Sequence, residues 1–238
     1  MRKSIAGLIV GSALIAGCSH DEDGGPTVTR NYQVANFQQV EAAGAFDVDI
    51  RTGAHPGVSA QGSQKLLENT VVEVEGNKLL IRPKEQGGFH FGWSHRGKAH
   101  FTVTVPQLTA ATLAGAGDLN IDSVSGDSFE ATMAGAGHLT IGSVNLKSLK
   151  VSTAGAGDAK IASGQAEAAE YAAVGAGDVD ASGVTTRQLK ANVAGAGSLK
   201  AHATGAADLT MMGAGDITVT GGAKCNITKR GPGDVSCS

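Results

Sequence analysis

The sequence predicts an all-β fold, a parallel β-helix-like solenoid of about seven two-strand coils with 18–20 residues each. A Gly-small-Gly triplet returns every 20 residues and later every 18, a fixed period that is typical of stacked solenoids. On both sides of the triplets, apolar residues alternate with polar ones at period two, as in strands with one buried face. The triplet glycines are Gly115, Gly117, Gly135, Gly137, Gly155, Gly157, Gly175, Gly177, Gly195, Gly197, Gly213, Gly215, Gly231 and Gly233.

Each triplet is expected to form a sharp turn between two strands, because glycine adopts positive φ at low cost. A second turn is expected at the far end of each coil, where serine and glycine gather, as at Ser123–Gly126 and Ser163-Gly164. Each coil is then expected to consist of a strand, a glycine turn, a second strand and a Ser/Gly turn, in this order. An antiparallel meander closing into a barrel or propeller is the alternative, but it leaves the constant phase between coils unexplained.

Composition is consistent with a folded, close-packed chain. The 238 residues are 41% hydrophobic and include 35 glycines, and the apolar periodicity persists through the glycine-rich part. The formal net charge is −3, and no basic patch carries interleaved aromatic residues. Nucleic-acid binding is therefore not expected.

Residues 1–17 are expected to be a signal peptide. Arg2 and Lys3 supply a positive start, and the apolar run from Ile5 to Ala16 is too short to span a membrane. The stretch Leu14-Ile15-Ala16-Gly17-Cys18 resembles the lipobox of bacterial lipoprotein precursors, which implies cleavage before Cys18 and a diacylglycerol on its thiol. An ordinary secretory signal with an incidental cysteine is the alternative.

The resemblance to lipoproteins also implies a location. Ser19, and not an aspartate, follows Cys18, which by resemblance to lipoprotein sorting favours the outer membrane, with the protein facing the periplasm or the surface. Residues 18–30 are polar, acidic and interrupted by glycine and proline, so we expect a lipidated cysteine followed by a flexible tether.

Residues 31–107 are expected to form a β-rich N-terminal cap, and residues 108–238 the repeats. The segment Val40–Ile50 aligns with the later coils around Gly44, which predicts an entry coil. Further strands are expected at Val71–Val74, Lys78–Arg82 and His100–Val105, with a turn at Glu75-Gly76-Asn77 and one helical turn at Gln64–Glu68. A cap is needed because the edge of a terminal coil would otherwise pair with other chains.

The order of these segments resembles the head GIN domain family of auto-transporter adhesins, which includes envelope lipoproteins. The resemblance runs from about Phe37 to the C-terminus. Its most specific part is the step from Val103-Thr104-Val105-Pro106-Gln107-Leu108 into the first glycine turn. It implies a shape similar to pectin-lyase-like β-helices without the catalytic residues of those enzymes, and an adhesin role.

An acidic row follows the glycines at a constant offset. A column of carboxylates on stacked coils could bind Ca²⁺, but aspartate also suits this position because its side chain accepts backbone N–H groups. We favour the second reading, under which a chelator leaves the melting temperature unchanged. His138 and Ser198 interrupt the row, whose members are Asp47, Asp118, Asp158, Asp178, Asp216 and Asp234.

The segment 89–100 carries three histidines and the one tryptophan of the chain. Histidines five residues apart do not share one face of a helix or a strand, so an exposed contact loop is favoured over a metal site. No metal or cofactor is therefore expected.

Cys225 and Cys237 lie six residues before and six after Gly231, at inward positions. We expect a disulfide between them across the last coil, with their Cα atoms within about 7 Å. Two buried reduced thiols are the alternative.

These observations favour a lipid-anchored envelope protein whose head binds a surface glycan or protein and which is not an enzyme. Its walls would present outward residues such as Asn120, Lys160, Asp180 and Lys200. A periplasmic structural or scaffolding lipoprotein without a host partner is the second reading. A carbohydrate-active β-helix enzyme is the third, and it would need a local acid–base cluster that evenly spaced aspartates do not supply.

Overall fold

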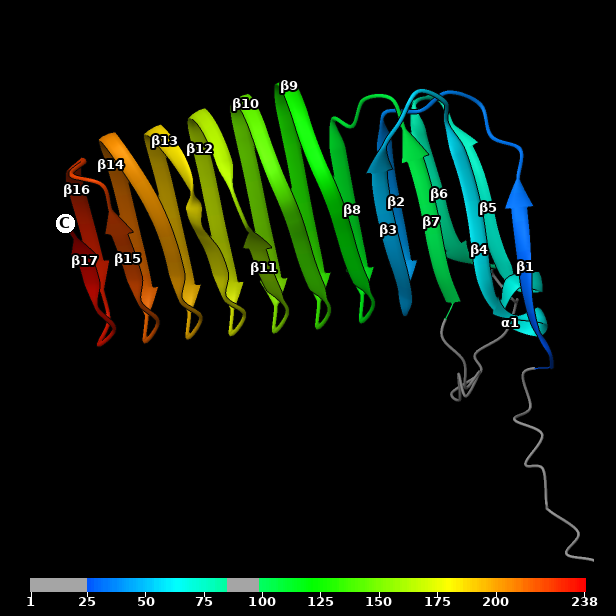
Figure 1. The fold of residues 1–238 in the computed structure, drawn as a ribbon. Coiled ribbons are helices and arrows are strands. Elements are labelled where there is room, and N and C mark those ends of the chain that lie inside the picture. The colour runs from blue at the N-terminus through cyan, green and yellow to red at the C-terminus, as the bar shows by residue number, and fades with distance from the viewer. Residues whose placement is uncertain (1–24, 85–98) are drawn as a thin grey trace, which may run out of the picture.

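The computed structural model describes residues 25–84 and 99–238, and Figure 1 shows them as a long stack of strands. The fold is an all-β solenoid of about six turns with repeats of about 20 residues, preceded by an N-terminal β region. Successive coils pair in parallel, which rules out the antiparallel meander. The strands of the stack are β8 (Ala110–Gly115), β9 (Asp118–Gly135), β10 (His138–Gly155), β11 (Asp158–Ile161), β12 (Gly164–Gly175), β13 (Val179–Gly195), β14 (Leu199–Gly213), β15 (Ile217–Thr220), β16 (Lys224–Arg230) and β17 (Val235–Cys237).

Each coil begins after one glycine turn and ends with the next. The coils are numbered 1 to 6 and span residues 118–137, 138–157, 158–177, 178–197, 198–215 and 216–233. The seventh coil of the prediction is represented by β17, which pairs with β15.

The far end of each coil is longer than the expected Ser/Gly turn and forms a wall of its own. In coil 1 the first wall is 118–121, the short wall 123–126 and the long wall 128–135. The pairing of β9 with β10 omits Asp122 and Asp127, which lie at the two corners between these walls. Val124 points inward on the short wall and is 4% exposed.

The change of period from 20 to 18 residues falls entirely around the short wall. Between coils 4 and 5 the register moves from Ala181↔Ala201 to Thr185↔His202, so coil 5 lacks three residues there. It regains one further along, before Gln188↔Ala206. The long wall and the glycine turn therefore stay in register.

The glycine turns stack directly on one another. The first glycine of each triplet has positive φ, for example 140° at Gly135 and 138° at Gly195. At the third glycine the constraint is the neighbouring coil, because a Cβ on Gly137 would overlap the carbonyl oxygen of Gly117. The middle alanines point outward, as the exposed Ala156 illustrates.

The core is the narrow interior between the walls. In coil 1 it is built from Leu119 and Ile121 on the first wall and from Phe129, Ala131 and Met133 on the long wall, each at most 3% exposed. Packing of similar side chains at the same position in successive coils makes one continuous apolar column.

The predicted entry coil is present and fits the first repeat. It consists of β2 (Gln39–Gly44) and β3 (Phe46–Thr52). Gly44 pairs with Gly115, and Val48 and Ile50 pair with Leu119 and Ile121. These are the equivalences that the alignment of Val40–Ile50 predicted.

The N-terminal cap extends the walls beyond the entry coil, at the end of the stack where Figure 1 labels β1 and β4 to β7. β6 and β7 pair in parallel with β2 and β3, and antiparallel strands then end each layer. The expected helical turn is α1, whose start is capped by the Ser63 hydroxyl. The cap contains β1 (Thr27–Tyr32), β4 (Gly57–Ser63), α1 (Gln64–Glu68), β5 (Thr70–Glu75), β6 (Lys78–Pro83) and β7 (Ala99–Val105).

The predicted tether over 18–30 ends too late. β1 already begins at Thr27 and pairs antiparallel with β4, with Thr27 opposite Ser63. Its Thr-Val-Thr sequence has high β propensity. The prediction of a tether relied instead on the polar and acidic composition of the whole segment. Within the described parts of the chain, no helix is long and apolar enough to cross a membrane.

Candidate functional site

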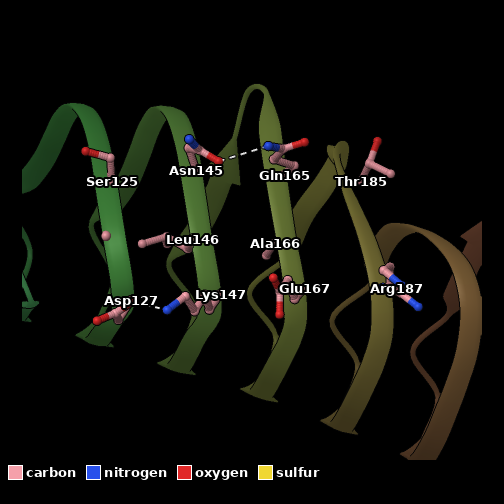
Figure 2. A pocket seen from close by; sticks show the side chains of 11 residues that line it. Ser125, Asp127, Asn145, Leu146, Lys147, Gln165, Ala166, Glu167, Thr185 and Arg187 are labelled. Carbon is pink, nitrogen blue, oxygen red and sulfur yellow. Dashed lines mark hydrogen bonds and ion pairs between the residues drawn. The ribbon is translucent and has the colours of Figure 1, made fainter.

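A shallow groove of about 600 Å³ runs across the short walls of coils 1 to 4, parallel to the solenoid axis (Figure 2). Three columns of residues form it, one from each of three successive positions around the coil. The lining residues are Ser125, Gly126, Asp127, Asn145, Leu146, Lys147, Gln165, Ala166, Glu167, Thr185 and Arg187.

The floor of the groove is apolar. Gly126, Leu146 and Ala166 occupy it, and they pair with one another in register. Leu146 and Ala166 are only 5% and 4% exposed. Gly126 has a φ of 140° and no side chain, which leaves space beside Leu146.

One rim is polar and uncharged. Ser125, Asn145, Gln165 and Thr185 stand at equivalent positions of coils 1 to 4. The Gln165 Nε2 donates a hydrogen bond to Asn145 Oδ1 at 2.9 Å. In-register parallel strands favour such amide ladders because equivalent side chains lie one strand spacing apart.

The other rim is charged and alternates in sign. Asp127, Lys147, Glu167 and Arg187 occupy the corner between the short and long walls. The Lys147 Nζ lies 2.7 Å from Asp127 Oδ1. The hydrogen bond from Lys147, followed by its charge, lowers the pKa of the Asp127 carboxyl, and the same bond raises the pKa of Lys147. Arg187 extends away from Glu167 in Figure 2 and has no ion-pair partner among the residues that the structure describes.

A second alternating column runs beside the first, on the long wall. Lys150 pairs with Glu130 at 2.8 Å and Lys190 with Glu170 at 3.4 Å. Asp208 follows in coil 5, in register with Lys190. Because both columns change sign together, this face carries charge stripes: coils 1, 3 and 5 are negative and coils 2 and 4 positive. A smaller hollow of about 290 Å³ lies over the second column.

The predicted acidic row has the structural role that was favoured. In five places, the carboxylate of a row aspartate accepts a hydrogen bond from the backbone N–H of the equivalent residue in the next coil. It does not accept one from its own turn in these contacts. The donors and distances are Asp118 N to Asp47 (3.2 Å), His138 N to Asp118 (3.2 Å), Asp178 N to Asp158 (2.9 Å), Ser198 N to Asp178 (2.7 Å) and Asp234 N to Asp216 (2.9 Å). The row therefore links coils along the axis. Among the described residues, no group of three or more His, Cys, Asp or Glu side chains is arranged to hold a metal ion.

The predicted disulfide is present. Cys225 and Cys237 are bonded, with Cα atoms 6.5 Å apart, inside the expected limit. Cys225 lies in register with the buried Ala207 and Cys237 with the buried Val219, so the inward positions are also confirmed. Both cysteines are partly buried against the core.

Two other predicted sites fall wholly or mostly outside the described residues. Cys18 is one, and the histidine and tryptophan segment 89–100 is described only from Ala99. His100 lies in β7, where its Nε2 is 3.1 Å from Asp49 Oδ2. The expected outward residues Asn120, Lys160, Asp180 and Lys200 form one column on the first wall, away from the groove.

The groove itself was not predicted. Its residues belong to the far end of the coil, where the sequence predicts only a Ser/Gly turn. The signal that could have found it is the alternation of sign every 20 residues at Asp127, Lys147, Glu167 and Arg187.

Comparison with known proteins identifies relatives of the whole described fold. The family model described as "Putative auto-transporter adhesin, head GIN domain" matches residues 36–223. No curated protein matches the chain.

Several solved structures share the fold, and three of them are described here. A "putative adhesin" from Bacteroides fragilis has a TM-score of 0.81 at 22% identity, covering 90% of this chain and 97% of its own. A "putative lipid binding protein" from Parabacteroides distasonis has a TM-score of 0.72 at 20% identity, covering 91% and 98%. A "putative adhesin" from the same species has a TM-score of 0.70 at 21% identity, again covering 91% and 98%.

Proposed function

The chain belongs to the head GIN domain family, and from this premise we propose that it is a lipid-anchored adhesin of the cell envelope. Its solenoid head binds a glycan or a protein on a surface, and the groove across the short walls is the binding site. The family is described as adhesins, and the relatives from Bacteroides fragilis and Parabacteroides distasonis named above as adhesins carry the same fold.

The observation that carries the binding role is the groove. It combines an apolar floor, an uncharged polar rim and a charged rim, a combination that suits ligand recognition. Its floor and its uncharged rim stand on strands that pair with the neighbouring coils, so binding would require little ordering of the protein there.

The groove is poorly suited to hydrolysis. Glycoside hydrolases use a general acid whose pKa is raised, facing a second carboxylate. The pKa of Asp127 is lowered instead, by the hydrogen bond and charge of Lys147. This argues for binding without turnover.

The anchor is supported by the resemblance of Leu14–Cys18 to a lipobox. Several acyl chains on Cys18 would hold the protein firmly in the outer membrane, where a single chain would not. The folded part begins shortly afterwards, at β1, so the head would stand close to the bilayer.

Labelling with palmitate tests the anchor. We expect the full-length protein to take up label and the variant Cys18→Ser to lose it. A matched control is Cys225→Ser with Cys237→Ser, which should keep the label. If Cys18→Ser is labelled as strongly as the natural sequence, the protein is not a lipoprotein anchored at this residue.

Protease treatment of intact cells tests the adhesin role. A surface-exposed head is digested, whereas a periplasmic scaffolding lipoprotein is protected until the outer membrane is opened. Full-length protein in detergent should then bind members of a mixed panel of immobilised glycans and proteins. Protection in intact cells together with no binding to the panel would exclude the adhesin role.

A further inference from the structure

We propose that the groove binds a neutral, linear glycan that lies along the solenoid axis with one sugar residue over each coil. This inference rests on the proposed binding function and names its ligand class. It follows from five properties of the groove, which are its period, its hydrogen-bonding groups, its paired backbone, its charge balance and its ends.

The period favours a glycan over a peptide. Equivalent rim residues stand one strand spacing apart, about 4.8 Å, because Ser125, Asn145, Gln165 and Thr185 are in parallel register. An extended peptide advances about 3.3 Å per residue and returns to the same face after about 6.6 Å, so it does not match this spacing. The advance of one pyranose residue along an extended glycan is close to the spacing of the coils.

The hydrogen-bonding groups of the rim suit sugar hydroxyls. Each hydroxyl both donates and accepts, and so does each amide and each hydroxyl of the rim. The bond from Gln165 to Asn145 uses one donor and one acceptor site, which leaves further amide N–H groups and lone pairs for a ligand. The apolar floor of Gly126, Leu146 and Ala166 can receive the C–H face of a sugar ring.

In the central part of the groove, coils 2 and 3, the backbone is not free to pair with a peptide strand. Asn145 and Gln165 belong to strand segments that are paired with neighbouring coils on both sides. Addition of a peptide strand needs a free sheet edge. Recognition must therefore use side chains.

The charges of the groove balance. Asp127 and Lys147 form an ion pair, and Glu167 and Arg187 add one charge of each sign. A polyanion or polycation lying along the groove would meet as many like charges as opposite ones. A neutral chain avoids this cost, while the ionised rim still offers strong hydrogen-bonding partners for hydroxyls.

The groove is lined by coils 1 to 4 alone, and other polar side chains stand beyond its two ends. On the cap side, Asn77 donates to Gln38 at 3.2 Å and Gln38 to Gln107 at 3.3 Å. Gln107 Nε2 lies beside Gly126 at the end of the groove floor. On the other side, the shortened coil 5 places His202 opposite Thr185 and ends the rim. The four coils span about 14 Å, which suits about four sugar residues.

A panel of neutral linear oligosaccharides, from disaccharide to octasaccharide, tests the proposal with the full-length protein in detergent. We expect affinity to rise with chain length up to about four sugars and then to level off. It should be insensitive to salt, since no net charge is exchanged. Acidic polysaccharides and the proteins of the mixed panel serve as competing ligand classes.

A pair of matched double variants assigns the site. Asn145→Ala with Gln165→Ala removes the amide rim, and we expect at least about a tenfold loss of affinity. Asn192→Ala with Thr210→Ala removes comparable polar groups from the long wall and should leave affinity unchanged. Both variants should have the melting temperature of the natural sequence, which would show that their folding is intact.

The outcomes separate the two proposals. Binding only to proteins or only to acidic polysaccharides overturns the neutral-glycan assignment and leaves the adhesin function standing. The same holds if neutral glycans bind but the amide-rim variant is unaffected. No binding to any member of the panel, with the head protected in intact cells, overturns both.

Discussion

Two physical demands select the glycines of each turn. The first glycine adopts a positive φ that other residues reach only with strain, as at Gly135. In addition, the first and the third glycine both face a carbonyl oxygen of the preceding coil, where any Cβ would overlap, as at Gly135 and Gly137. The first demand is local, so the sequence motif predicts it. The second is a contact between residues 20 positions apart and becomes visible only when the coils are stacked.

Tyr171 fills an unusual layer of the core. The interior of coil 3 is otherwise mostly alanine, at Ala159, Ala166, Ala169 and Ala173, so one large ring fills the space that these small residues leave. Its hydroxyl is buried and has no hydrogen-bond partner among the described residues. Burial raises the pKa of this hydroxyl.

Replacing Tyr171 with Phe should stabilise the protein. The ring is kept while the unsatisfied hydroxyl is removed, which is worth about 1 kcal/mol. Denaturant unfolding of both proteins at neutral pH measures the difference. Tyr171→Leu is the control for the ring and should destabilise through the cavity it leaves. A loss of stability in Tyr171→Phe would mean that the hydroxyl has a partner.

The same substitution should change the response to alkaline pH. The pKa of Tyr171 is raised in the folded state, so above pH 10 the unfolded chain loses this proton more readily than the folded one. Titration of this hydroxyl therefore leaves the free energy of unfolding unchanged below pH 10 and lowers it as the pH rises further. The free energy of unfolding should fall less steeply in Tyr171→Phe than in the natural sequence, and equal slopes would contradict this.

At the scale of the element, the last coil has to end the core. Lys229 occupies the column that holds the buried Met211 one coil earlier, and its Nζ lies 3.4 Å from Asp234 Oδ1. An inward-pointing charge on an edge strand opposes pairing with another chain. The disulfide then joins Cys225 on the long wall of coil 6 to Cys237 in β17, the strand that follows this coil.

Removing the disulfide should loosen this coil alone. Its two cysteines are 12 residues apart, which corresponds to about 3 kcal/mol in the loop-entropy model. In Cys225→Ala with Cys237→Ala, hydrogen exchange should accelerate over residues 216–238 and stay unchanged in coils 1 to 4. Reduction of the natural protein should reproduce this effect and should not affect the variant. Unchanged exchange over 216–238 would show that stacking on coil 5 is sufficient.

The elements that could be predicted from sequence are those with an uninterrupted local signal. The long alternating runs that flank the glycines gave the two main strands, and the match between Val40–Ile50 and the repeats gave the entry coil. The disulfide could be predicted because its two cysteines lie six residues before and six residues after Gly231, at positions that point inward in the other coils. The short wall has at most two buried positions in each coil, such as Val144 and Leu146, which is too few to show alternation, so the groove built on it was missed.

At the scale of the whole molecule, the surface is ordered by the charge stripes. Opposite charges meet at each boundary between coils 1 to 5, and three of these contacts are ion pairs within 3.4 Å. Each exposed pair contributes little alone. Like charges in the same places would be destabilising instead, so the stripes favour the observed register of the stack.

Deleting coils should reveal this order. Removing residues 158–177 stacks Lys147 and Lys150 on Arg187 and Lys190, so like charges meet. Removing 138–177 stacks Asp127 and Glu130 on the same two cations, so opposite charges still meet. Salt screens both interactions. Between low and high sodium chloride, the melting temperature should therefore rise for the first variant and fall slightly for the second. The same response in both would show that the stripes carry no weight.

The charge stripes thus give the solenoid a parity. The backbone repeats with every coil, whereas the charged columns of coils 1 to 5 repeat with every second coil. Gain or loss of an even number of coils preserves both periods, and an odd number breaks only the outer one. A head of this kind can therefore be lengthened without bringing like charges together only by adding coils two at a time. The unit that can be duplicated is a pair of coils and not a single coil.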